Sequence, residues 1–273
     1  RMGEYTYACS DFKFKKGLVS ATKTSGHTLQ IADGLWLDKK FKAAMMKSIA
    51  QSELDRKRFV YSDIGFILLQ QVVEAVTGKT LDAYLVSEFY RPMGLEHTLF
   101  QPLNRYKKAD IMPTAANDYL RRQDLCGYVY DEAAAFMGGV SGNAGLFSTA
   151  QELGKIYQMI LNEGELDGKR YLRPETCRIF TTEKSAVSHR GLGYDKPNLK
   201  DPKANACASS APASVYGHTG FTGTCTWVDP ENDLVYIFLS NRLCPDAWNG
   251  KLNSMKLRQA IQEVIYQSLY TPE

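Results

Sequence analysis

The hydrophobic pattern changes its period part-way along the chain, and this change limits the folds that are open to it. Over residues 64–77, apolar side chains recur at the three- and four-residue spacing of a helix, and Gly78 follows as a left-handed cap. After residue 212 the sequence becomes rich in Thr, Val, Tyr, Phe and Trp, in segments 216–228 and 234–240 that flank a polar turn. Helices followed by an antiparallel hairpin predict an α/β chain of the α+β kind, in which helices flank an antiparallel sheet.

Start and stop signals place the other elements. Thr149 followed by Glu152 is a capping-box pattern that opens a helix, and Pro174 suits the first turn of another. Residues 1–40 predict loops with short strands, and the glycine-dense segment 138–145 predicts either a substrate-side loop or a plain turn. Further helices are expected over residues 41–52, 81–90 and 252–269.

The chain is long enough for one domain with a sizeable core. It has 273 residues, of which 44% are hydrophobic and 23% are charged, a composition typical of globular proteins. We expect a single domain over residues 1–273. Its helix-rich part should cover about 40–185, and its sheet hairpin and closing helix about 212–270.

Charge and cysteine content exclude several classes of function. A formal net charge of +3, without a run of five or more Lys or Arg, argues against nucleic-acid binding. No stretch of about 18 apolar residues predicts a membrane span, and the first residues lack the apolar core of a signal peptide. The six cysteines are scattered without a Cys-x-x-Cys pair. This pattern predicts free thiols, leaves one disulfide open, and indicates no metal site or cofactor.

Two short segments are candidates for chemistry. Tyr61-Ser62-Asp63 directly precedes the strongest helix, where a phenol can point into a cleft. His218-Thr219-Gly220 lies on the first strand of the hairpin, where glycine lets a ligand or another backbone approach closely. Taken singly, each segment has an ordinary structural interpretation: a packing tyrosine before a helix, and an edge or bulge in a strand.

Together, in this order, the two segments resemble the second and third characteristic elements of the penicillin-recognising serine hydrolases, Tyr-x-Asn and Lys/His-x-Gly. The similarity extends from about residue 59 to the C-terminus and covers segments 61–79, 91–98, 142–150, 217–223 and 239–242. The chain thus resembles the serine β-lactamase/penicillin-binding-protein-like hydrolases of the class C-like kind. It is most similar to the serine-hydrolase domains that Bacteroidetes fuse behind family-three glycoside hydrolase modules.

The resemblance implies a mechanism with named residues. A serine at a helix start attacks an acyl carbonyl and forms an acyl-enzyme. Tyr61 would transfer protons as general base or acid, and His218 would orient the substrate or tune Tyr61. The backbone N–H of Phe221 would be one donor of the oxyanion hole, and the nucleophile's own N–H the other. The substrate-binding positions implied are Asp63, Thr219 and Gly220.

The nucleophile is the first departure from the family pattern. The family carries it in a Ser-x-x-Lys motif at a helix start, well upstream of the tyrosine motif. Here the match Ser20-Ala21-Thr22-Lys23 lies close to Tyr61 and is followed by poor helix-forming residues, so we do not expect Ser20 to be the nucleophile. We expect instead a fragment without the N-terminal portion of the fold and without the serine, inactive or weakly active by itself.

The second departure is Asp63, where the family usually has Asn. An ionised Asp only accepts hydrogen bonds, whereas Asn also donates them. The negative charge disfavours carboxylate-bearing substrates such as penicillins. The resemblance therefore implies a serine acyl-hydrolase of the esterase or peptidase type, acting on cell-wall-like or acylated-sugar substrates in the periplasm or cell envelope.

A non-catalytic alternative remains open. Asp63 and the unmatched Ser-x-x-Lys motif also suit a module that binds glycan or peptidoglycan fragments, or that packs against an attached glycoside hydrolase. Tyr61 and His218 weigh against this alternative, because a scaffold has no physical need for both. Glycosidic hydrolysis by this chain itself is not expected, since no carboxylate pair has a clear acid–base setting.

Overall fold

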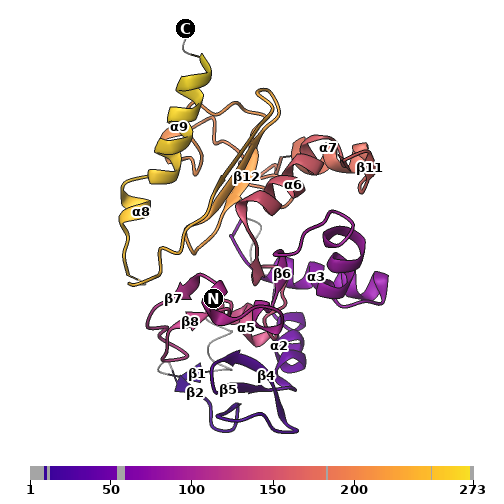
Figure 1. Cartoon of the computed structure of the whole chain (residues 1–273), viewed down its shortest axis with the longest axis vertical. Coiled ribbons are helices and arrows are strands. Elements are labelled where there is room, and N and C mark those ends of the chain that lie inside the picture. Colours follow the sequence, from indigo (N-terminus) through magenta and orange to yellow (C-terminus); the bar gives the residue numbers. More distant parts are fainter. Residues whose placement is uncertain (1–8, 11–12, 54–58, 183, 247, 271–273) are drawn as a thin grey trace. The chain divides into compact units, whose positions relative to one another are not determined.

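The computed structural model describes residues 9–10, 13–53, 59–182, 184–246 and 248–270. The chain forms two compact units (Figure 1). The first unit comprises residues 1–87, 98–147 and 243–247, and the second comprises residues 88–97, 148–242 and 248–273.

A three-stranded antiparallel sheet and one helix form the core of the first unit. Strands β3 (Val19–Ser20), β4 (His27–Ala32) and β5 (Leu35–Asp38) pair in the order β3–β5–β4. Helix α2 (Phe41–Ala50) follows, and the residues that it buries recur every four positions, starting at Phe41. The rings of Phe41 and Phe136 meet edge to face, with their centroids 5.2 Å apart. The short strands and the first helix predicted for this region are confirmed.

Helix α3 (Ile64–Thr77) has the predicted bounds, and Gly78 ends it with a left-handed φ of 68°. Its burial differs from what the apolar spacing suggests. The residues that it buries are Ile67 and Gln70. The apolar side chains exposed along it are Phe66, Leu68, Leu69, Val72 and Val76. The periodicity therefore predicted the helix correctly but not the face by which it is held.

Short elements complete the first unit. Helix α4 (Leu81–Leu85) continues as a π-helical turn over Val86–Tyr90 and ends before Pro92, as predicted. The other elements are strands β1 (Cys9–Ser10), β2 (Lys13–Phe14), β6 (Leu99–Phe100), β7 (Pro113–Ala115), β8 (Leu125–Cys126) and β9 (Leu146–Phe147), and helix α5 (Glu132–Phe136). Three antiparallel pairs form among these strands: β1 with β2, β6 with β9, and β7 with β8.

The second unit is built on another three-stranded antiparallel sheet. Strands β12 (Tyr216–Thr219), β13 (Cys225–Asp229) and β14 (Leu234–Phe238) lie side by side in that order. The predicted segment 216–228 is thus two strands rather than one, because a turn at residues 220–224 reverses the chain. The buried rings of Trp227, Tyr236 and Tyr266 form the centre of this unit's core.

In Figure 1 the sheet lies between helix α9 (Leu257–Tyr270) on one side and helices α6 (Ala150–Leu161) and α7 (Pro174–Thr182) on the other. The predicted closing helix is divided, because Lys256 takes a left-handed φ of 49° between α8 (Lys251–Ser254) and α9. A small hairpin of β10 (Glu165–Leu166) and β11 (Lys169–Arg170) separates α6 from α7. This mixture of helices and antiparallel sheets confirms the predicted α+β fold class.

The capping box at the start of α6 is only half formed. The Thr149 hydroxyl accepts a hydrogen bond from the Glu152 backbone N–H at 3.3 Å, as predicted. The Glu152 carboxylate, however, accepts from the backbone N–H groups of Glu96 and His97, each at 2.9 Å. It also contacts Nδ1 of His97 at 2.9 Å. Glu152 therefore joins segment 88–97 to α6 within the second unit.

Disulfides, clusters of metal ligands and membrane-spanning helices can be sought only among the residues that the structure describes. Within it, five cysteines are free thiols, and the side chain of Cys9 lies outside the described residues. No three metal-ligating side chains gather there, and no helix there is long and apolar enough to span a bilayer. The predicted single-domain boundaries stay a prediction.

Candidate active site

The tyrosine segment lies in the loop that enters α3. Tyr61 is 54% exposed. The carbonyl of Asp63 accepts hydrogen bonds from the backbone N–H groups of Phe66 and Ile67, at 3.0 and 3.2 Å, so Asp63 occupies the N-cap position. Its carboxylate does not cap the helix. The helix start thus fixes the backbone of Asp63, two residues after Tyr61.

A buried glutamine ties α3 to the glycine-dense loop. Gln70 is 2% exposed. Its amide oxygen accepts from the N–H of Gly142 at 3.2 Å, and its amide nitrogen donates to the carbonyl of Val140 at 3.3 Å. A Cβ on Gly142 would lie 2.2 Å from the carbonyl oxygen of Phe66, so the loop approaches the helix backbone directly. The glycine-dense segment therefore packs against the helix that follows Tyr61, and its role beside a substrate stays a prediction.

The second segment runs along β12 and into the turn that follows. His218 pairs with Thr226 and Thr219 with Cys225, where the ladder to β13 ends. The turn is closed by a hydrogen bond from the Gly220 N–H to the Thr224 carbonyl at 2.8 Å. Phe221 lies beyond the ladder in this turn, and its side chain is 60% exposed. The predicted oxyanion donor is thus on an exposed turn at the end of a strand.

The hydrogen bonds of His218 fix its tautomer. Nδ1 lies 2.7 Å from the carbonyl oxygen of Thr219, so it donates its proton to that acceptor. Nε2 lies 3.1 Å from Nη1 of Arg190, and since a guanidinium only donates, Nε2 accepts. These contacts fit the tautomer that carries its proton on Nδ1.

Arg190 belongs to a small charged cluster that the sequence did not suggest. Its Nη2 lies 3.4 Å from a carboxylate oxygen of Asp195, and Nε2 of His189 lies 3.0 Å from the other oxygen. Asp195 is 5% exposed, and its backbone pairs with that of Gly217 through two hydrogen bonds, at 2.7 and 3.1 Å. His189 is therefore one partner of a buried carboxylate beside β12.

A second arginine lies on the turn itself. The guanidinium carbon of Arg242 lies 4.7 Å from the ring centroid of Phe221, and its Nε donates to the Phe221 carbonyl at 2.8 Å. Arg190, which is paired with Asp195, and Arg242 are thus two cationic side chains near the end of β12. Neither arginine was singled out from the sequence, since both lie outside the motif and reach it only through the fold.

The Beta-lactamase family model matches residues 21–254 of this sequence. The chain belongs to the beta-lactamase family. A protein of Escherichia coli (strain K12) named "Putative D-alanyl-D-alanine carboxypeptidase" is 38% identical over 197 residues, which are 68% of this chain and 45% of that protein. A Salmonella gallinarum protein of the same name is 32% identical over 227 residues, 78% of this chain and 52% of that protein. The chain spans about half the length of these curated relatives.

Among solved structures, the family fold is matched by simvastatin synthase from Aspergillus terreus, with a TM-score of 0.56 and 16% identity. The aligned region covers 86% of this chain and 63% of the synthase. At this level of identity the likeness concerns the fold alone. It supports the α+β, beta-lactamase-like architecture.

The two Ser-x-x-Lys matches in this beta-lactamase family chain have their serines on strands. Ser20 lies on strand β3, opposite Trp36, and its hydroxyl accepts from the backbone N–H of Thr22 at 3.3 Å. Lys23 stacks over the Trp36 ring at 5.5 Å. A second Ser-x-x-Lys match has Ser10 at the end of β1 and Lys13 at the start of β2. Neither serine opens a helix, which agrees with the expectation that Ser20 is not the nucleophile.

The two motif segments fall in different units. Residues 61–63 belong to the first unit, and residues 218–221 to the second. The structure places each segment within its own unit as described, and the catalytic and substrate-binding roles of Tyr61, Asp63, His218, Thr219, Gly220 and Phe221 stay predictions.

Proposed function

We propose that this chain forms part of a serine acyl-hydrolase, of the esterase or peptidase type, that works through an acyl-enzyme. The observation that carries the proposal is the path of β12. His218 and Thr219 end an edge strand, and Phe221 follows in an exposed turn directly beyond the ladder. In a family whose members acylate a serine, such a turn is suited to presenting a backbone N–H to an oxyanion.

Tyr61 is the proton-transfer group in this proposal. It is half-exposed and lies in a loop whose end is fixed by the start of α3. His218 acts as a neutral positioning group, because both of its ring nitrogens are already in use by Arg190 and by the Thr219 carbonyl. Asp63, Thr219 and Gly220 bind the substrate.

The substrate proposed is a peptide or ester of the cell wall. The relatives named as D-alanyl-D-alanine carboxypeptidases favour a peptidoglycan peptide. Asp63 opposes a substrate carboxylate on its side, while Arg190 and Arg242 favour negative charge near β12. The same relatives favour a periplasmic or envelope location. Class C-like chemistry and an attached glycoside hydrolase module remain parts of the proposal that rest on the sequence resemblance.

Replacing the phenol hydroxyl tests the proposal. In the native protein, Tyr61→Phe should lower kcat/KM for a chromogenic ester and for a D-alanyl-D-alanine-terminated peptide by about 10²- to 10⁴-fold, the usual contribution of an acid–base group. Tyr84→Phe on α4 is the matched control and should leave both rates unchanged. Labelling of wild type by a fluorophosphonate should identify the nucleophilic serine by its mass adduct.

Wild-type protein that neither reacts with the fluorophosphonate nor hydrolyses either substrate would contradict the proposal. The non-catalytic alternative would then apply, and peptidoglycan fragments should bind equally well to wild type and to Tyr61→Phe. Equal hydrolysis by wild type and Tyr61→Phe would instead remove Tyr61 from the mechanism while leaving the acyl-hydrolase assignment in place.

A further inference from the structure

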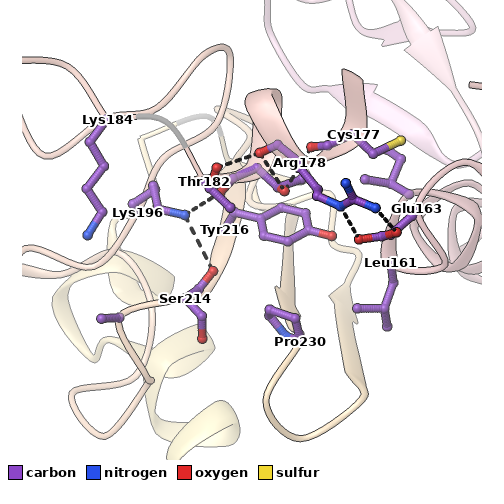
Figure 2. Close-up of a pocket in the computed structure, with 13 residues that line it drawn as sticks. Leu161, Glu163, Cys177, Arg178, Thr182, Lys184, Lys196, Ser214, Tyr216 and Pro230 are labelled. Atoms are coloured by element: carbon purple, nitrogen blue, oxygen red, sulfur yellow. Dashed lines mark hydrogen bonds and ion pairs between the residues drawn. The ribbon is translucent and has the colours of Figure 1, made fainter. Parts of the chain in front are cut away.

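A cavity of about 390 Å³ lies within the second unit and is lined by residues outside both motif segments (Figure 2). Its walls come from the C-terminal ends of α6 and α7, from Lys196, from the first residue of β12 and from the turn before β14. Neither His218 nor Phe221 lines it. Cavities of this size hold small organic ligands.

Lys196 is a buried cation in this cavity without a matching anion. The residue is 3% exposed. Its Nζ donates to the backbone carbonyls of Thr181 and Ser214, at 2.5 and 3.4 Å (Figure 2). These bonds occupy two of the three ammonium N–H groups. No carboxylate oxygen of the described residues lies within the 4.0 Å ion-pair distance of Nζ. A buried ammonium is costly unless a counter-charge accompanies it.

The other charged groups of the lining do not supply that counter-charge. Glu163 is held by Arg178, whose Nε and Nη2 lie 2.7 and 2.9 Å from its two carboxylate oxygens. This pairing lowers the pKa of Glu163. Lys184 is a second lining ammonium without a carboxylate of the described residues in ion-pair range. Among the described residues of the lining, the ammonium groups of Lys184 and Lys196 therefore have no carboxylate partner.

Burial and the nearby charge of Lys184 lower the pKa of Lys196 to about 8. The lysine thus remains largely protonated at neutral pH, at a cost that an incoming anion would relieve. The rest of the lining suits an apolar group, because the side chains of Ile160, Leu161, Tyr216 and Pro230 face the cavity. A ligand that suits both the lysine ammonium groups and the apolar lining has one anionic end and one apolar end.

We propose that this cavity binds a small organic carboxylate with an apolar body. The carboxylate accepts the remaining N–H of Lys196 and contacts the ammonium of Lys184, and the body packs against Tyr216 and Leu161. A carboxylate has two oxygens for these two ammonium groups. A phosphate would need further donors, and the guanidinium of Arg178 in the lining is already paired with Glu163.

Benzoate is the probe, and benzamide is its neutral counterpart of similar shape. By isothermal titration at pH 7, benzoate should bind the wild-type protein, while benzamide should bind at least about tenfold more weakly. Lys196→Met should weaken benzoate by about tenfold or more, the effect of losing a charge-assisted hydrogen bond. Lys200→Met, which removes an exposed lysine of the same unit that does not line the cavity, should leave the affinity unchanged.

A second variant covers the case in which Lys196→Met does not fold. Ala213→Phe places a ring in the cavity and keeps both lysines, so it should abolish benzoate binding. Absence of benzoate binding to wild type at 10 mM would overturn the proposal, as would equal binding of benzamide or unchanged affinity in both cavity variants. Inorganic phosphate that binds where benzoate does not would also overturn it, since the site would then be a simple anion site.

Discussion

At the scale of single residues, the hydrogen bonds of His218 add to the role expected of it. The family resemblance implied a group that orients the substrate or tunes Tyr61. In the structure, Nε2 is placed to accept from Arg190 and Nδ1 to donate to the strand's own carbonyl. The histidine therefore links Arg190 to the strand.

Removing Arg190 should release the imidazole from this arrangement. In Arg190→Gln, Nε2 loses its guanidinium donor, so the ring should exchange between the two neutral tautomers. Long-range proton–nitrogen NMR of the histidine side chains should show one Nδ1–H tautomer in wild type and an averaged pattern in the variant. Arg173→Gln, an exposed arginine of the same unit, should retain the wild-type spectrum. A mixture of tautomers in wild type would contradict the assignment.

At the scale of elements, α3 shows what periodicity can and cannot predict. The apolar spacing gave the right bounds because it reports local helical geometry. It did not predict that the helix is fixed through Ile67 and the amide of Gln70, because the partners of Gln70 lie seventy and more residues later in the chain. The same limit applies to β12 and β13, which the sequence presented as one strand because strand-forming residues continue across the turn.

Substitution by alanine should change the free energy of unfolding in opposite directions at two glycines, one in α3 and one in the loop that packs against it. Gly142→Ala should lower the free energy of unfolding by about 1–3 kcal/mol, since its Cβ would meet the Phe66 carbonyl at 2.2 Å and the loop would have to move. Gly65→Ala lies within the helix with no atom within 4 Å of its Cβ, and should raise the free energy of unfolding by about 0.5–1 kcal/mol. Urea unfolding measures both. A destabilised Gly65→Ala, or an unaffected Gly142→Ala, would contradict this description of the contact.

At the scale of the whole molecule, the sequence predicted the family and fold class well, and its site residues stay predictions. Tyr61 and His218 could be proposed because they lie in short motifs with a fixed order. The sequence did not point to Arg190, Asp195 and His189, because they lie in a loop that the fold joins to β12 by the backbone bridge between Asp195 and Gly217. The sequence also gave no sign that Lys196 is buried without a carboxylate partner among the described residues, because nothing in the sequence distinguishes it from the other lysines.

Lys196 should also leave a signature in the stability of the folded protein. Its pKa is about 8 when folded and near the ordinary value of 10.5 when unfolded. Below pH 8 both states hold the proton. Between these values the unfolded state binds more protons, so the free energy of unfolding should rise with pH, by up to about 1.4 kcal/mol per pH unit.

The comparison with Lys196→Met isolates this contribution. Buried tyrosines such as Tyr216 have a raised pKa and act in the opposite direction at high pH, but they are present in both proteins. Urea titrations from pH 7 to 9.5 measure the free energy of unfolding of both proteins. The value for wild type minus the value for the variant should therefore increase as pH rises. A difference that is constant over this range would show that Lys196 has an ordinary pKa.

The glycines near His218 also show that some motif residues can be conserved for folding alone, whereas others report activity. A Cβ on Gly217 would lie 2.0 Å from the Thr226 carbonyl, and one on Gly220 would lie 2.3 Å from the Thr224 hydroxyl. Selection for a sound sheet is thus enough to retain both glycines, even in a lineage whose enzyme has stopped working. Tyr61, more than half exposed, is under much weaker demand from packing. Among proteins descended from this one, the presence or loss of this tyrosine should therefore distinguish active from inactive enzymes.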